Sequence, residues 1–199
     1  YNKVAFEGHV GCIMKTTKNK VELPYQMWSM DKIKPDTKAL DKWAKKFKGP
    51  YMLSVKLDGV SGLYSTEKDK PALYTRGNGV IGQDVSHLIP YLNLPTTENI
   101  TIRGEFIMTK ETFKHKYASD FASARNLIAG LVNQKAIEPY KFKDIHFVAY
   151  ETIHPEMKPS EQFKFLEKES TTSGLQVAKH LTEKKVSNEL LSELLLEWR

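Results

Sequence analysis

A lysine, an aspartate and a glycine stand close together in the run Lys56-Leu57-Asp58-Gly59. A lysine amine is a nucleophile only when it is neutral, and a free lysine with a pKa near ~10.4 is neutral in about one molecule in 10³ to 10⁴ at pH 7. Partial burial between Val55 and Leu57, together with a nearby cation, would lower this pKa. Gly59 would permit a sharp turn, and Asp58 could position the ammonium or help to place a metal. The same run also fits a solvated strand end that leads into a turn, so alone it establishes no site.

A glycine-rich segment, residues 75–85, follows this run and contains Arg76, Gly77, Asn78 and Gly79. Glycines would let Arg76 and backbone N–H groups approach a phosphate without hindrance from a Cβ atom, and Arg76 is also a candidate for the cation beside the lysine. The Asn78-Gly79 pair is equally a strong signal for a tight hairpin turn. The two interpretations are compatible with each other.

A third polar position lies in the strand predicted over residues 100–108. Apolar residues alternate there with polar ones, which leaves Glu105 on the face opposite Phe106. The alternative is an exposed strand carboxylate without a functional role.

Taken in order, these segments resemble the adenylation domain of NAD-dependent DNA ligases. Residues 24–31, Pro-Tyr-Gln-Met-Trp-Ser-Met-Asp, are similar to the Pro-Met-Leu-Ser-Leu-Asp stretch of the family, and Ala124-Arg125-Asn126 resembles its helix start. Arg103-Gly104-Glu105 and Phe147-Val148-Ala149-Tyr150 look like its two nucleotide-binding strands. The resemblance runs from about Pro24 to Tyr150. The glycine-rich segment favours NAD over ATP, because ATP-dependent ligases and capping enzymes share Lys-x-Asp-Gly but lack this segment.

The resemblance implies a role for each matching residue. Lys56 would store AMP as a phosphoramide, with Asp58 as its catalytic partner, before AMP passes to the 5′-phosphate of nicked double-stranded DNA. Glu105 would bind the ribose, and Tyr150 would stack on adenine, although Tyr150 alone fits a core or interface tyrosine. The implied cofactors are NAD and Mg²⁺, with the metal held by phosphates and water and no protein metal ligand expected. Nucleotide contacts are expected from Ser29, Met30, Leu57, Gly59, Arg76, Glu105 and Tyr150, and nucleic-acid contacts from Arg125 and Asn126.

The sequence departs from the family pattern at one binding position, and it lacks one downstream segment of the family. Ser54 stands where bacterial relatives carry a glutamate that reads the adenine amino group. The downstream Asp-Gly-Val-Val-Ile-Lys-like strand of the family is not found before Arg199. We therefore expect residues 1–199 to form one adenylation domain that is incomplete at its C-terminus, without the N-terminal nicotinamide-binding, oligonucleotide-binding, zinc and helix-hairpin-helix modules.

Composition narrows the class of protein. The net charge of +6 and the pI near 9.2 favour an acidic partner such as nucleic acid, although the lysine-rich residues 42–48 also fit the solvated face of an amphipathic helix. The single cysteine, Cys12, excludes an internal disulfide and a thiolate zinc site. No apolar run approaches the ~18 to 20 residues of a membrane span. We expect an intracellular monomer in the compartment of DNA replication or repair, which is the cytoplasm if the source is bacterial or viral.

The pattern of elements predicts an α+β protein with mainly antiparallel sheets flanked by helices, which the resemblance refines to a nucleotidyltransferase (ATP-grasp-like) fold. Lys56 is expected at a strand end within an antiparallel meander. Strands are predicted over residues 51–57, 60–65, 72–75, 100–108, 145–151 and 174–177, and helices over 36–47, 110–116 after the cap Thr109, 121–133, from Pro159, and after the cap Ser187.

Two other functions remain open. An ATP-dependent DNA or RNA ligase would use the same lysine chemistry with a different donor. A non-catalytic nucleic-acid-binding derivative would have kept the fold and lost the chemistry, but the joint presence of Lys56, Asp58, Gly59, Arg76 and Glu105 favours an enzyme.

Overall fold

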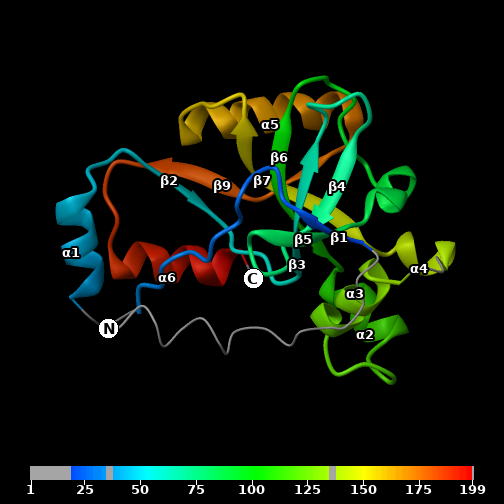
Figure 1. Cartoon of the computed structure of the whole chain (residues 1–199). Helices are drawn as coiled ribbons and strands as arrows, with labels where there is room; N and C mark the ends of the chain where they lie inside the picture. The colour runs from blue at the N-terminus through cyan, green and yellow to red at the C-terminus, as the bar shows by residue number, and fades with distance from the viewer. Residues whose placement is uncertain (1–18, 35–37, 135–137, 199) are drawn as a thin grey trace, which may run out of the picture.

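A seven-stranded sheet forms the centre of the computed structural model, which describes residues 19–34, 38–134 and 138–198 (Figure 1). Its strand order is β1-β5-β4-β3-β6-β7-β8, and every neighbouring pair is antiparallel except β7 and β8. Helices flank the sheet, so the predicted α+β class is confirmed. The strands are β1 (Lys20–Glu22), β3 (Val60–Ser65), β4 (Ala72–Thr75), β5 (Ile81–Asp84), β6 (Thr101–Ile107), β7 (His146–His154) and β8 (Gln176–Val177).

A separate two-stranded ribbon is made by β2 (Tyr51–Ser54) and β9 (His180–Glu183). The predicted strand over residues 51–57 is therefore too long, and its place in the meander is wrong. The chain leaves β2 after Ser54, passes Lys56 without strand structure, and enters β3 beyond Gly59. The reason is a long-range pairing with β9 that the local apolar pattern does not reveal.

Three of the described helices begin at a serine or threonine cap. Thr109 Oγ1 accepts a 3.1 Å hydrogen bond from the Thr112 N–H, and Ser187 Oγ accepts one of 3.2 Å from the Leu190 N–H, as predicted. Ser123 caps a helix that is shorter than predicted, and the expected helix start at Asp36, like Cys12, lies outside the described residues. The helices are α1 (Ala39–Lys46), α2 (Lys110–Lys116), α3 (Ala124–Val132), α4 (Pro139–Phe142), α5 (Pro159–Ser173) and α6 (Asn188–Glu197), with a 3₁₀ helix over Ser86–Tyr91.

The two faces of the sheet have different environments. Alternation along β6 turns Ile102 and Phe106 into the main core, where α3 and α5 contribute apolar side chains such as Leu127 and Leu166. The opposite face carries a small cluster of Leu23, Met27, Leu63 and Tyr74. Polar residues beside this small cluster therefore lie on a sheet whose opposite face packs against the main core.

No helix in the described ranges is long and apolar enough to cross a membrane.

Candidate active site

Lys56 and Asp58 lie in the linking segment between β2 and β3, and both side chains are exposed. The expected partial burial of Lys56 between Val55 and Leu57 is therefore wrong. Gly59 is buried immediately before β3, where a Cβ atom would lie 2.0 Å from the Phe106 carbonyl oxygen. A glycine is required here by contact with β6, which fixes the chain three residues after Lys56.

Glu105 lies in the middle of β6 and is only 7% exposed. Ser61, its partner across β3, donates a 2.9 Å hydrogen bond from Oγ to the carboxylate. Burial raises the pKa of Glu105, while the Ser61 hydrogen bond, the charges of Lys56 and Arg125, and the Gly59 N–H oppose that rise. The polar face of the strand was predicted correctly, but the carboxylate is buried and held by the protein.

Tyr150 lies on β7 where the register with β6 shifts. Arg103 pairs with Glu151 and Gly104 with Ala149, so Tyr150 has no residue opposite it. Burial, followed by the negative charge of Glu105, raises the pKa of the Tyr150 phenol to about 12. The β-bulge thus places a half-buried neutral phenol next to the carboxylate.

The first turn of α3 reaches the lysine segment through an ion pair. Arg125 Nη1 lies 3.2 Å from Asp58 Oδ1, and both side chains are largely exposed. The charge of Arg125 also acts on Glu105. The Asn126 N–H donates to the Ser123 cap, and the Asn126 side chain is exposed without a described contact to the other site residues.

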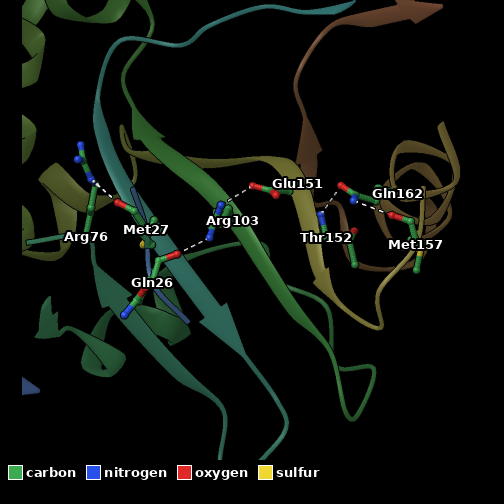
Figure 2. A network of polar contacts seen from close by, with 8 residues as sticks. All are labelled: Gln26, Met27, Arg76, Arg103, Glu151, Thr152, Met157 and Gln162. Atoms are coloured by element: carbon green, nitrogen blue, oxygen red, sulfur yellow. Dashed lines mark hydrogen bonds and ion pairs between the residues drawn. The ribbon is translucent and has the colours of Figure 1, made fainter. Parts of the chain in front are cut away.

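Arg76 holds the segment that follows β1 against the sheet, as Figure 2 shows. Its Nε donates to the Met27 carbonyl at 2.8 Å and its Nη2 donates to Ser29 Oγ at 2.8 Å. Its own N–H donates to the Ser61 carbonyl at 2.9 Å. Through its guanidinium and its backbone N–H together, Arg76 connects Ser29 to the strand that carries Ser61.

Arg103 is a second clamp on the same segment. It donates to the Gln26 carbonyl and, at 2.8 Å, to the Glu151 carboxylate (Figure 2). Its side chain thereby joins the segment after β1 to β7. Sequence reasoning assigned no role to this arginine.

The predicted hairpin turn after Arg76 is confirmed. Gly77 and Gly79 have φ values of 54° and 95°, and Asn78 Oδ1 accepts hydrogen bonds from the Val80 and Ile81 N–H groups. These two N–H groups are occupied inside the turn. Gly79 also brings Met27 close, because a Cβ at this position would lie 2.8 Å from the Met27 carbonyl oxygen.

Four of the predicted site residues act directly on the carboxylate of Glu105, namely Lys56, Gly59, Tyr150 and Arg125. Asp58 is connected to them through its ion pair with Arg125. Arg76 is connected through its backbone N–H bond to the Ser61 carbonyl, and Ser29 through Arg76. Met30 is 64% exposed and, like Leu57, has no described contact with these residues.

Comparison with known families shows to which family the chain belongs. The NAD-dependent DNA ligase adenylation domain matches residues 15–198. The chain belongs to this family. Within the adenylation domain family the donor is NAD, so the match does not favour an ATP-dependent ligase.

Two relatives of this adenylation domain are named DNA ligases. That of Acanthamoeba polyphaga mimivirus is 43% identical over 155 residues, or 74% of this chain and 24% of the viral protein. That of Lactobacillus johnsonii is 30% identical over 164 residues, or 73% of this chain and 25% of the bacterial protein. The chain spans about a quarter of the length of these curated relatives.

Ser61 is the residue of the adenylation domain that sequence reasoning missed most clearly. A signal was present, because Ser61 lies two residues from Leu63 on a strand whose faces alternate. That alternation places the hydroxyl on the face of Glu105, and its significance appears only when β3 and β6 are paired.

The described part of the site offers few side chains that could ligate a metal ion. In the described part of the chain, no group of three or more His, Cys, Asp or Glu side chains could hold a metal ion. Asp58 is the exposed carboxylate beside Lys56. One carboxylate fits Mg²⁺, which is commonly bound through one or two carboxylates together with substrate phosphates and water.

Proposed function

We propose that this adenylation domain takes AMP from NAD onto Lys56 and passes it to the 5′-phosphate of nicked double-stranded DNA. The observation that carries the proposal is the buried carboxylate of Glu105, which Ser61 holds by a hydrogen bond and which lies close enough to Lys56 and Arg125 to feel their charges. A buried, hydrogen-bonded carboxylate next to an exposed lysine is suited to fix a polar ligand in front of a nucleophile.

The first chemical step belongs to Lys56. Its neutral Nζ attacks the α-phosphorus of the adenosine half of NAD, and a P–N bond forms while the P–O bond to the bridging oxygen breaks. Nicotinamide mononucleotide leaves, and the proton of Nζ passes to water. In the second step a DNA 5′-phosphate oxygen attacks the same phosphorus, which breaks the P–N bond and frees the lysine.

Glu105 and Tyr150 orient the donor for this attack. A carboxylate has about four acceptor positions, so Glu105 can bind ribose hydroxyls while it retains the hydrogen bond from Ser61. Tyr150 offers a flat, neutral face for adenine. Ser29 and Met30 belong to the segment held by Arg76, where we propose contacts to the nucleotide mainly through backbone groups.

Charge neutralisation at the phosphates falls to cations around Lys56. Arg76 follows β4, whereas Arg125 lies in the first turn of α3. We propose that Arg125 and Asn126 contact the DNA backbone. Mg²⁺ would supply Lewis-acid stabilisation of the phosphates, with Asp58 as its protein contact. We further propose that the α+β arrangement is the nucleotidyltransferase (ATP-grasp-like) fold.

The test is the intact mass of the chain after incubation with Mg²⁺ and either NAD or ATP. The proposal expects a gain of one AMP with NAD and none with ATP. A gain with ATP alone would contradict it in favour of an ATP-dependent ligase. Retention of DNA binding with no gain from either donor would favour a non-catalytic nucleic-acid-binding derivative of the fold.

A further inference from the structure

Lysines line one face of α1, which lies at the outer end of the β2–β9 ribbon, away from the main sheet (Figure 1). Lys38, Lys42, Lys45 and Lys46 follow spacings of three and four residues. Successive helix positions turn by about 100°, so these four fall within an arc of roughly 100°. The buried Leu40 lies on the other side of the helix.

The basic face continues onto residues that are distant in sequence. Tyr51 ties the end of α1 to β2, since its hydroxyl donates to the Phe47 carbonyl at 2.7 Å and its ring lies 5.3 Å from that of Trp43. The backbone of Lys184 packs against Gly49, where a Cβ would lie 2.7 Å from the Lys184 carbonyl oxygen. These contacts place Lys184 and Lys185 next to Lys48. The seven residues Lys38, Lys42, Lys45, Lys46, Lys48, Lys184 and Lys185 are called the basic surface below.

These segments carry an excess of positive charge that is close to the net charge of the whole chain. All seven lysines are exposed, and none has an ion-pair partner among the described residues. Residues 38–48 and 183–185 contain only two carboxylates, Asp41 and Glu183, so this surface carries a formal charge of +5 out of +6 for the whole chain. An amphipathic helix needs a polar face, but it does not need one sign of charge to extend across two further loops.

We propose that the basic surface binds the phosphate backbone of duplex DNA on one side of the nick, an inference that rests on the proposed function. Clustered, unpaired lysines bind phosphates by releasing counterions and read no sequence. The Trp43 ring packs against those of Tyr51 and Phe47, and Lys46 Nζ lies 5.0 Å from the centre of the Phe47 ring, so the faces that could stack on unpaired bases are largely covered within the cluster. These features favour a duplex over a single strand.

The basic surface and the lysine nucleophile can contact one duplex. Lys48, the basic-surface residue nearest to Lys56 in the sequence, is eight residues from it, which an extended chain spans in at most about 29 Å. That length corresponds to about eight base pairs at roughly 3.4 Å each. A duplex seated at Lys56 can therefore reach the near end of the basic surface within one helical turn.

The experiment measures the affinity of the full chain for a fluorescent nicked duplex over a range of salt concentrations. The variant K42Q/K45Q/K46Q removes three charges and keeps good helix formers in α1. A matched control, K68Q/K164Q/K168Q, removes three exposed charges elsewhere, and circular dichroism confirms that both variants fold. We expect the slope of log K against log[salt] to shrink by roughly 2 to 3 in the α1 variant, at about 0.9 per phosphate contact, and to be unchanged in the control.

Two results would overturn the basic surface as the DNA contact. One is an equal loss of affinity and slope in both variants, which would indicate net charge alone. The other is an α1 variant that binds the duplex like the wild type, or whose loss is larger for single-stranded DNA or RNA of equal length.

AMP uptake from NAD, measured on the same samples, separates this inference from the proposed function. Both triple variants should take up AMP like the wild type, because none of their substitutions lies among the site residues. Normal AMP uptake with equal DNA binding by both variants would reject the basic surface only. A wild type that takes up no AMP, with DNA affinity still lost in the α1 variant, would reject the proposed function only.

Discussion

Ser61 and Glu105 face each other across β3 and β6, and the Ser61 hydroxyl donates a 2.9 Å hydrogen bond to the Glu105 carboxylate. The carboxylate is buried, so it depends on the few groups that stabilise its charge. Ser61 is the strongest of these, ahead of the charges of Lys56 and Arg125. A serine that lies outside the recognisable motif therefore gives the main opposition to the rise in the pKa of Glu105 that burial causes.

Replacing Ser61 by alanine should slow AMP transfer and move its pH dependence. The lost hydrogen bond removes an influence that lowers the pKa of Glu105, so the acid limb of the rate profile should shift to higher pH. A hydrogen bond to a charged group contributes about 1.5 kcal/mol or more, which predicts a fall of roughly tenfold near the acid limb. Single-turnover rates from pH 5 to 9 provide the measurement.

Ser61→Thr is the conservative control for this change, since it keeps a hydroxyl on a strand position. It should restore most of the rate and the original position of the acid limb. An alanine variant whose rate falls equally at every pH would indicate a packing defect instead.

Glu105→Gln should make the protein more stable at neutral pH while it impairs AMP transfer. Burial raises the pKa of Glu105 above its ordinary value, so the folded protein binds the proton more tightly than the unfolded chain does. The folded protein therefore loses stability as the pH rises from the pKa of Glu105 in the unfolded chain through its higher pKa in the folded protein. Glutamine does not ionise, so it avoids that loss. Urea unfolding should show a stability gain at pH 7.5 that narrows toward about pH 4.3, the ordinary pKa of glutamate. A glutamine variant that is less stable at pH 7.5 would show that the attraction of Lys56 and Arg125 outweighs burial.

The adenine contact of Tyr150 depends on its ring and not on its ionisation. With a pKa of about 12, the phenol remains neutral throughout any practical assay. Tyr150→Phe should therefore leave the KM for NAD nearly unchanged and keep the alkaline limb in place. Tyr150→Ala should raise the KM by roughly 5- to 150-fold, because stacking of one base contributes about 1–3 kcal/mol. Equal effects of Phe and Ala would instead assign the role to the hydroxyl.

The local sequence predicted the caps and strands that need only neighbouring residues. Thr109, Ser187 and the bounds of β3 and β4 were read correctly, because caps and turns are set within a few positions. The pairing of β2 with β9 was missed, since nothing near Tyr51 indicates a partner so far along the chain.

The same distinction between local and long-range features applies to the candidate site. The residues that meet at Glu105 were found through their motif spacing, but the exposure of Lys56 and the roles of Ser61 and Arg103 were not. Burial and cross-strand contacts depend on the register of β3, β6 and β7, and motif spacing carries no information about that register.

Gly79 and Gly130 form a matched pair for testing how the segment after β1 is seated. Gly79→Ala places a Cβ 2.8 Å from the Met27 carbonyl oxygen at a φ of 95° and should cost about 1–3 kcal/mol of unfolding free energy. Gly130→Ala lies within α3 with no atom within 4 Å of the new Cβ and should gain about 0.5–1 kcal/mol. Chemical denaturation compares the two. A tolerated alanine at Gly79 would contradict the close approach of Met27.

The Arg76 clamp should control whether that segment is ordered. Arg76→Lys keeps the charge but cannot donate to the Met27 carbonyl and Ser29 Oγ in the same fork geometry. We expect faster amide exchange and proteolysis near Ser29 and a several-fold higher KM for NAD, with little change in global unfolding. A lysine variant that matches the wild type in amide exchange would show that charge alone is sufficient.

Peptide mapping by mass spectrometry after incubation of the chain with NAD and Mg²⁺ tests the central claim most directly. We expect one AMP, acid-labile as a phosphoramide, on the peptide that contains Lys56, and none on Lys56→Ala or Lys56→Arg. An AMP carried by another residue, or a folded chain that remains unlabelled with NAD, would contradict the assignment of Lys56 as the nucleophile of this site.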